Sequence, residues 1–524
     1  MAERYLSAGS PDRYFVRIED GVDGGGEAIS EQQRSRPLIW LLRASGPVAA
    51  IVVWILLANA QDLDEQARVV AAVGTLMAIW WMAEAIPLAA TSLLPIALFP
   101  TLAGLPVAEV TAPYANPIVF LFLGGFLLAI GLEKWNVHRR FALVVLRIIG
   151  TGPHSIILGM MLATGFLSMW VSNTATTLMM LPIGVSLISL VTDGLGENEE
   201  KSAHVEQFGV CMMLAIAWSA SMGGLGTLLG SPPNAIIAAY ALTELGIRIG
   251  FLDWMVIGVP TSFAFILIGW FLMTRVLYPF RLDGPSDGHD TLDQEIAALG
   301  PVRRGEKMAL GAFAAAAFFW IVPGLAAGII AMPAWLTAID DAVIAIAAAL
   351  SLFLLPANAD GDAVLNWKDA EESLPWGVLL LFGGGLSLAS AVSATGLDGW
   401  MGSFVGDMAA LPVVLLIAAI VALVIFLTEV TSNTATAATF IPILGAVAIA
   451  MDMDPMSLLV PAALAATCAF MLPVGTPPNA IVFSTGRVGI KQMARGGVIL
   501  NLVGVVLITL ACYLLGDAAM GLRY

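Results

Sequence analysis

Charge is scarce in this chain of 524 residues: Asp, Glu, Lys and Arg make up 12% of it, about half of the usual share in soluble domains. There are only three cysteines, an odd number, all in apolar segments, so neither a disulfide framework nor a metal cluster is supported (Cys211, Cys468 and Cys512). The motif HExxH is absent, and no Cys/His pair has a usable spacing. We therefore expect no enzyme, no organic cofactor and no nucleic-acid partner, and keep an intramembrane enzyme only as a remote alternative.

Apolar residues are abundant, with 59% of the chain hydrophobic and a mean hydropathy of +0.89. Apolar stretches of about 18 to 25 residues, each long enough to cross a bilayer, recur along the sequence. They predict an all-α polytopic membrane protein with eleven transmembrane spans, near residues 38–58, 66–84, 86–104, 116–134, 206–241, 252–279, 305–325, 336–356, 373–393, 457–484 and 494–516.

Lys and Arg indicate the orientation, because short loops that carry them stay in the cytoplasm. Residues 1–36 are polar and have no signal-peptide core, which predicts a disordered cytoplasmic tail. With the basic clusters inside, the N-terminus is cytoplasmic and the C-terminus extracytoplasmic in the cell inner (plasma) membrane. These clusters are Arg34/Arg36/Arg43, Lys134/Arg139/Arg140/Arg147, Arg275/Arg281/Arg303/Arg304/Lys307 and Arg487/Lys491/Arg495.

The tripeptide Ser-Asn-Thr occurs twice in one apolar frame, FLSMWVSNTATTLMMLPI around Asn173 and FLTEVTSNTATAATFIPI around Asn433. Hydroxyl and amide groups offer oxygens to a hard cation and hydrogens to an anion without carrying charge. The enclosing segments, 153–190 and 411–450, have the tripeptide at their middle, which leaves arms of about 15 to 18 residues, marginal for a crossing. We expect two re-entrant helical hairpins, because backbone that turns at membrane depth must be buried in protein or line a wet cavity.

A second pair of motifs, GSPPNAI at 230–236 and GTPPNAI at 475–481, follows the two hairpins. Consecutive prolines remove backbone donors and break a helix, which exposes carbonyls and a half-helix N-terminus. Broken helices at matching places in two halves indicate a transporter's midplane binding site.

The repeat extends beyond these motifs. An offset of 260 residues carries both the tripeptide and Gly124-Gly125 onto a second copy, at Gly384-Gly385. The five spans between the hairpins invert the second copy, so the tips at Asn173 and Asn433 are expected within about 10 Å, the span of one dicarboxylate.

With these motifs the chain resembles the divalent anion/sodium symporters, a family that includes carriers of succinate, malate, fumarate and citrate. The resemblance extends over nearly all of the chain after the tail, including WWMAEAIPLAATSLLPIALFP from Trp80 to Pro100. It implies a sodium-coupled symporter that imports C4 dicarboxylates, built as an inverted-repeat, elevator-type homodimer in the lipid bilayer. It also implies six regions: a tail (1–36), scaffold helices (37–150 and 305–408), transport-domain hairpins with broken helices (151–280 and 409–524) and a cytoplasmic loop (281–304).

The resemblance also implies site residues. It implies a first sodium site formed by the Ser168 and Ser172 hydroxyls, the Asn173 amide and the Gly230 carbonyl. It implies a second sodium site formed by Thr428, the Thr431 carbonyl, Asn433 and the Gly475 carbonyl. Substrate carboxylates are expected at Asn173, Thr174, Asn433 and Thr434, near Ser231, Thr476 and Pro477.

Sodium is then a co-transported ion. Neither hairpin core contains Lys or Arg, so bound cations and half-helix N-termini must balance a dianion. Glu429 is an intramembrane acid, for which support of the second sodium site and a structural contact both stay open. A sodium-independent dicarboxylate exchanger and a carrier of sulfate or citrate are the alternatives.

Overall fold

The computed structural model describes residues 36–60, 63–192, 199–282, 288–326, 333, 339–358, 360–402 and 412–522. Within these ranges the protein is helical, and the only strand-like pairing described is an isolated bridge between Pro356 and Ala363. The all-α expectation is confirmed. Apart from Arg36, the expected tail lies outside the described residues.

The first half of the chain contains three kinds of helix: long apolar ones, short ones around prolines, and the amphipathic α8. In order they are α2 (Arg36–Leu56), α3 (Glu65–Ala83), α4 (Leu88–Thr91), α5 (Leu94–Leu98), α6 (Val107–Thr111), α7 (Pro117–Lys134), α8 (Val137–Ile149), α9 (Pro153–Ser168), α10 (Asn173–Thr192), α11 (Glu199–Gly224), η4 (Leu228–Gly230), α12 (Pro232–Glu244) and α13 (Phe251–Leu272).

The second half has a similar order of long and short helices. They are α14 (Gly288–Ala298), α15 (Arg304–Ala326), α17 (Asp341–Leu354), α18 (Trp367–Ser373), α19 (Trp376–Ala394), α20 (Leu397–Gly402), α21 (Val413–Thr428), α22 (Asn433–Ala450), α23 (Met456–Ala466), α24 (Pro477–Ser484) and α25 (Ile490–Met520).

Ten helices of the described ranges are long and apolar enough to cross a membrane. The predicted span 86–104 is not one continuous helix: it folds into α4, α5 and a π-helical turn at Phe99–Ala103. Pro87, Pro95 and Pro100 each lack the backbone donor that a continuous helix needs. Of the predicted span 336–356, α17 accounts for 14 residues, and residues 336–338 lie outside the described part.

The region expected as a loop, 281–304, contains helix α14, which lies against α8. Two ion pairs join these helices, Arg139 to Glu295 at 3.1 Å and Arg147 to Asp293 at 2.8 Å. The other members of this basic cluster pair with α15 and α18, through Arg140–Glu306 at 2.7 Å and Lys134–Asp369 at 2.5 Å. Basic residues of α8, together with Lys134 at the end of α7, thus pair with acidic residues of α14, α15 and α18.

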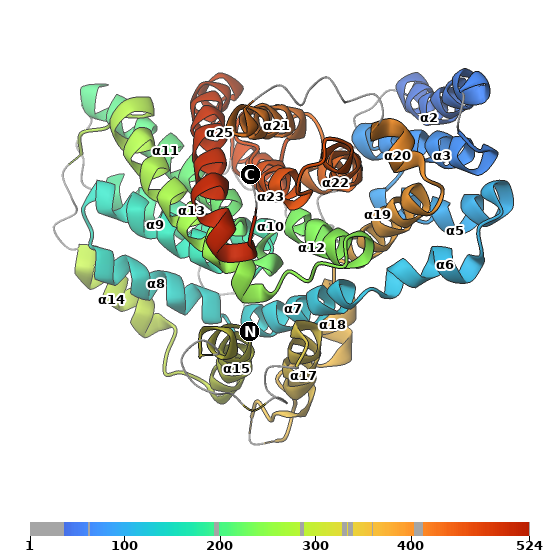
Figure 1. The fold of residues 1–524 in the computed structure, drawn as a ribbon. Coiled ribbons are helices and arrows are strands. Elements are labelled where there is room, and N and C mark those ends of the chain that lie inside the picture. Colours follow the sequence, from blue (N-terminus) through green and yellow to red (C-terminus); the bar gives the residue numbers. More distant parts are fainter. Residues whose placement is uncertain are drawn as a thin grey trace.

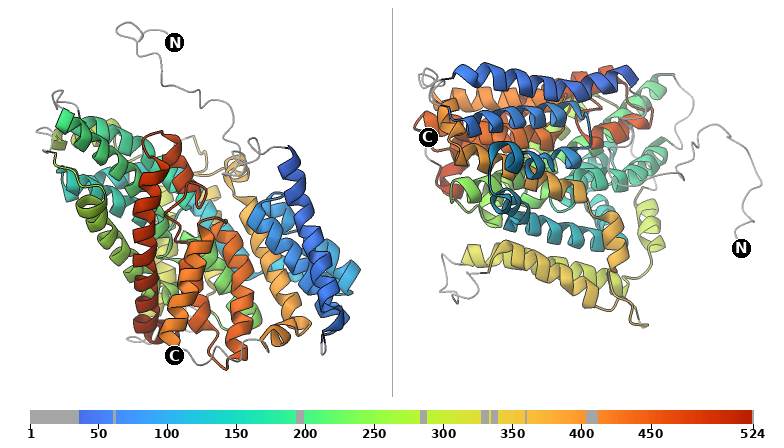
Figure 2. Two further views of the ribbon diagram at one scale, coloured as in Figure 1. Left: turned by 90° about the horizontal axis from the view of Figure 1, so that it is seen from above. Right: turned by 90° about the vertical axis from the view of Figure 1, so that its right-hand side faces the viewer.

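Three groups of helices are visible in Figure 1. Helices α2, α3, α5 and α6 lie on one side, α8, α9, α11 and α13 lie on the other, and α12, α22 and α23 lie between them. Figure 2 (left) shows the long helices α2 and α25 running roughly parallel. Of the central helices, α12 and α23 are nearly completely buried.

The repeated glycines lie where helix backbones touch. A Cβ added to Gly124 of α7 would lie 2.6 Å from the Ala345 backbone of α17, and one added to Gly384 of α19 would lie 2.5 Å from the Ser92 carbonyl oxygen. Only glycine permits these approaches without a backbone shift.

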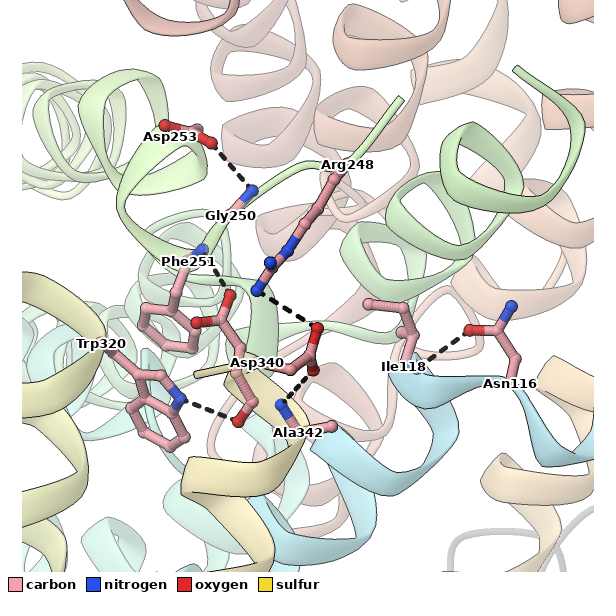
Figure 3. A network of polar contacts seen from close by, with 10 residues as sticks. Asn116, Ile118, Arg248, Gly250, Phe251, Asp253, Trp320, Asp340 and Ala342 are labelled. Carbon is pink, nitrogen blue, oxygen red and sulfur yellow. Dashed lines mark hydrogen bonds and ion pairs between the residues drawn. The ribbon is translucent and has the colours of Figure 1, made fainter. Parts of the chain in front are cut away.

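A polar network closes one end of this packing, as Figure 3 shows. Arg248, in the segment between α12 and α13, pairs with Asp340 at 3.2 Å, and Asp341 accepts a hydrogen bond from the Phe251 backbone at 3.1 Å. The Trp320 indole of α15 donates to the Asp341 carbonyl at 3.2 Å. The start of α13 is thereby fixed against α15 and α17.

Candidate functional site

Each Ser-Asn-Thr tripeptide lies at a turn between two helices. Helices α9 and α10 join at residues 169–172, and α21 and α22 join at residues 429–432. The arms have 16 and 20 residues in the first hairpin and 16 and 18 in the second, so only α10 exceeds the expected length. Each segment thus forms two helices joined by a turn. Two of these arms, in α10 and α22, are long and apolar enough to cross a membrane, and the re-entrant course of the hairpins stays a prediction.

The two tips have equivalent hydrogen bonds. The Ser168 hydroxyl lies 2.5 Å from Asn173 Oδ1, and the Thr428 hydroxyl lies 2.7 Å from Asn433 Oδ1, at the same offset of 260 residues. Each asparagine is the first residue of the helix that follows its turn. The repeat seen in the sequence is therefore also a repeat of local structure.

Both Pro-Pro motifs break their helices, as predicted. Helix α11 ends at Gly224 and α12 begins at Pro232, while α23 ends at Ala466 and α24 begins at Pro477. Ser231 and Thr476 are the N-caps of the second half-helices, and the Thr476 hydroxyl accepts from the Asn479 backbone at 3.4 Å.

At the first tip, one end of the Asn173 carboxamide lies 2.5 Å from Ser168 Oγ, 3.1 Å from the Ala220 carbonyl oxygen and 3.2 Å from the Gly230 carbonyl oxygen. With nitrogen at that end, the amide donates to all three atoms. With oxygen there, oxygens of four residues converge, an arrangement that a hard cation stabilises. The binding of sodium by these residues stays a prediction. The Ser172 hydroxyl already accepts from the Ala175 backbone at 3.2 Å.

At the second tip, the Thr428 hydroxyl also lies 3.2 Å from the Ala466 carbonyl oxygen. Gly475 lies beside this tip: a Cβ added to it would be 3.2 Å from both the carbonyl oxygen and Oε2 of Glu429. The Thr431 hydroxyl is engaged by Thr436 at 2.6 Å, which leaves the carbonyl, the group expected to bind sodium. No group of three His, Cys, Asp or Glu side chains in the described ranges could hold a metal ion.

A run of contacts connects the two tips. The Asn173 amide lies 3.2 Å from the carbonyl oxygen of Gly230, whose neighbour Ser231 accepts a hydrogen bond from Thr467 Oγ1 at 3.0 Å. The carbonyl of Thr467 lies 3.5 Å from Asn433 Nδ2. The predicted residues of both halves thus gather in one region, and their roles as ligands stay a prediction.

Four helices begin in this region: α10 at Asn173, α12 at Pro232, α22 at Asn433 and α24 at Pro477. A helix N-terminus carries partial positive charge and unpaired backbone N–H groups, so all four favour an anion. Neither hairpin contains Lys or Arg. Thr174 and Thr434, the second residues of α10 and α22, are half-buried, and Pro477 is exposed.

Glu429 is buried and makes a structural contact with the broken helix. Its carboxylate accepts from the backbone N–H groups of Phe470, Met471 and Leu472 at 2.6 to 3.1 Å, and from Asn501 Nδ2 at 2.8 Å. The equivalent residue of the first tip is Met169, whose carbonyl accepts from the Thr227 hydroxyl. Of the two roles considered for Glu429, the structure shows the structural contact. A role in support of the second sodium site stays a prediction.

Sequence reasoning missed Ala220 and Thr467. Ala220 contributes a backbone carbonyl in the apolar helix α11. Every residue has such a carbonyl, so the residue type gives no signal. An offset of 245 residues relates the two Pro-Pro motifs, and at this offset the counterpart of Thr467 is Met222. Because the polar residue is not repeated, comparison of the two halves does not single out Thr467.

Paired helical hairpins and paired broken helices, with their polar groups facing a buried centre, are the architecture of a secondary transporter. The chain belongs to the family described as sodium:sulfate symporter transmembrane region, whose family model matches residues 39–521.

Named relatives agree with this assignment. The sodium-dependent dicarboxylate transporter SdcS of Staphylococcus saprophyticus is 40% identical over 479 residues, 91% of each chain. The protein of the same name from Staphylococcus aureus strain USA300 is 40% identical over 481 residues, again 91% of each chain.

Two solved structures share the fold. The YdaH transporter of Alcanivorax borkumensis has a TM-score of 0.57 at 12% identity, with 93% of this chain and 99% of that one covered. MtrF of Neisseria gonorrhoeae has a TM-score of 0.52 at 14% identity, with 92% and 95% covered. This likeness concerns the fold alone.

Proposed function

We propose that this protein is a symporter that imports a C4 dicarboxylate such as succinate, malate or fumarate together with sodium ions. The observation that carries the proposal is the connected pair of tips. Each tip has an asparagine amide beside a hydroxyl, and the starts of four helices surround them. The names of the 40% identical relatives support both sodium and dicarboxylate.

The geometry favours a two-ended anion. Two tips with equivalent polar groups suit one carboxylate each, whereas a sulfate ion has a single centre of charge. The oxygens around Asn173 and Thr428 favour sodium coupling over sodium-independent exchange, because a dianion in a low-dielectric site needs positive charge nearby.

Movement of the site is part of the proposal. The two hairpins, the broken helices, α13 and α25 would slide as one elevator-type body against the remaining helices, in a homodimer with the N-terminus in the cytoplasm. The close packing of α13 with α25 and of α21 with α23 supports a single body. The basic residues around α8 support the orientation.

Purified protein in proteoliposomes should take up labelled succinate only with an inward sodium gradient. Uptake should rise steeply with sodium and fall to background in potassium or choline at the same membrane potential, because no fixed cation balances the dianion. Unlabelled malate and fumarate should compete, with sulfate and citrate as comparison anions. Equal uptake in sodium-free buffer would instead support the exchanger, and competition by sulfate alone would support an inorganic-anion carrier.

A further inference from the structure

Two asparagines outside the tips make the same unusual pair of contacts. Asn234 Nδ2 donates to the carbonyls of Gly224 at 2.9 Å and Thr227 at 2.8 Å. Asn479 Nδ2 donates to the carbonyls of Ala469 at 3.0 Å and Leu472 at 3.0 Å. All three pairs of equivalent positions lie 245 residues apart, so the two contacts are copies of one device.

These contacts replace backbone bonds that the helix breaks remove. The carbonyls at the end of a helix lack partners within it, and the two prolines that start the next half-helix have no N–H to offer. A primary amide has two hydrogens on one nitrogen and satisfies two carbonyls three residues apart. Asn234 thereby ties its half-helix to the end of α11 and to the segment that follows it, and Asn479 ties its half-helix to the segment that follows α23.

Packing alone does not account for an asparagine at these positions. Both side chains are fully buried, and Asn234 Oδ1 and Asn479 Oδ1 have no hydrogen-bond partner in the described part of the chain. A buried acceptor without a partner disfavours the folded state. An apolar residue of similar size would avoid this unfavourable free energy. The asparagine is therefore explained by its two N–H donors and not by packing.

Each tied segment contains a carbonyl expected to bind sodium. In the first, a Cβ added to Gly224 would lie 2.8 Å from Asn173 Oδ1 and 3.0 Å from the Gly230 carbonyl oxygen. In the second, the Leu472 carbonyl that Asn479 holds also accepts from the Gly475 backbone at 3.2 Å.

We propose that Asn234 and Asn479 are positioning residues, which fix the Gly230 and Gly475 carbonyls for the two sodium ions without touching them. This inference rests on the sodium coupling proposed above. Loss of either amide should lower sodium affinity, while the amides of Asn173 and Asn433, which are proposed to bind the dicarboxylate, stay in place.

The test compares Asn234→Ala and Asn479→Ala with wild-type protein in proteoliposomes. The sodium concentration for half-maximal succinate uptake should rise at least about fivefold, the equivalent of one typical hydrogen bond. The succinate half-saturation at saturating sodium should stay within about twofold. Asn234→Asp and Asn479→Asp keep the volume and, when protonated, one donor, so they should shift sodium dependence less and remain measurable if the alanine variants fail to fold.

Matched controls are Ser219→Ala and Ser457→Ala. Each removes a buried hydroxyl that donates to a backbone carbonyl three or four residues earlier in the chain, and each should leave the sodium dependence of uptake unchanged. Folded variants with unaltered sodium dependence, or with only a lower maximal rate, overturn the proposal.

Hydrogen exchange gives a readout that does not depend on transport. Amides of residues 225–231 should exchange faster in Asn234→Ala, and those of 467–476 faster in Asn479→Ala. If wild-type uptake proves independent of sodium, the proposed function fails. Unchanged exchange in both segments overturns the positioning role in either case.

Discussion

Asn173→Ala and Asn433→Ala are each expected to reduce sodium-driven succinate uptake at least about 100-fold, from the loss of about 3 kcal/mol of polar interaction with charged ligands. Each amide lies at the first residue of a helix and beside a hydroxyl, so one truncation removes a proposed ligand of both the cation and the carboxylate. Initial uptake rates in proteoliposomes at matched protein content measure the effect.

Asn358→Ala is the control for this pair. Asn358 bonds to Asp362 in the segment between α17 and α18, away from both tips, and its loss should leave uptake within about twofold. The two tip variants should elute and unfold as the wild type does, because the Asn173 and Asn433 side chains are only half-buried. Near-normal uptake in either tip variant would show that the site assignment at that hairpin is wrong.

Gly224→Ala is expected to abolish sodium-driven uptake through crowding. The added Cβ would lie 2.8 Å and 3.0 Å from the two terminal atoms of the Asn173 amide and 3.0 Å from the Gly230 carbonyl oxygen. Contacts this short force the amide and carbonyl apart, so both members of the first sodium site move. We expect a loss of at least about 100-fold in uptake at low sodium, as for the loss of the amide itself.

Gly311→Ala provides the matched comparison. Gly311 lies in the exposed face of α15, and a Cβ added there meets nothing within 4 Å. This substitution should leave transport unchanged and stabilise the helix slightly. If Gly224→Ala transports as well as Gly311→Ala with the same sodium dependence, the space beside Asn173 does not belong to a sodium site.

The repeated motifs made the centre of this protein predictable from its sequence. Ser-Asn-Thr and Pro-Pro-Asn depend on local chemistry: polar groups at a turn, and prolines that end a helix. Both features appear where the sequence put them, in the turns before Asn173 and Asn433 and in the breaks before Pro232 and Pro477.

Features that depend on tertiary contacts were harder to predict. The interval 86–104 is apolar enough for a span, yet three prolines divide it into short helices, and hydropathy alone does not weigh them. The Ser231–Thr467 contact joins residues 236 positions apart and has no counterpart in the repeat. The two carbonyls that Asn234 holds become visible only when the break is seen in three dimensions.

The central claim is that both tips form one binding site for a dicarboxylate and sodium. A structure determined by cryo-electron microscopy with saturating sodium and succinate tests it most directly. We predict one elongated density that contacts the Asn173 and Asn433 amides together, with ion density beside Gly230 and Gly475. A succinate density that contacts neither tip, or tips on opposite membrane surfaces tens of ångströms apart, would contradict the account.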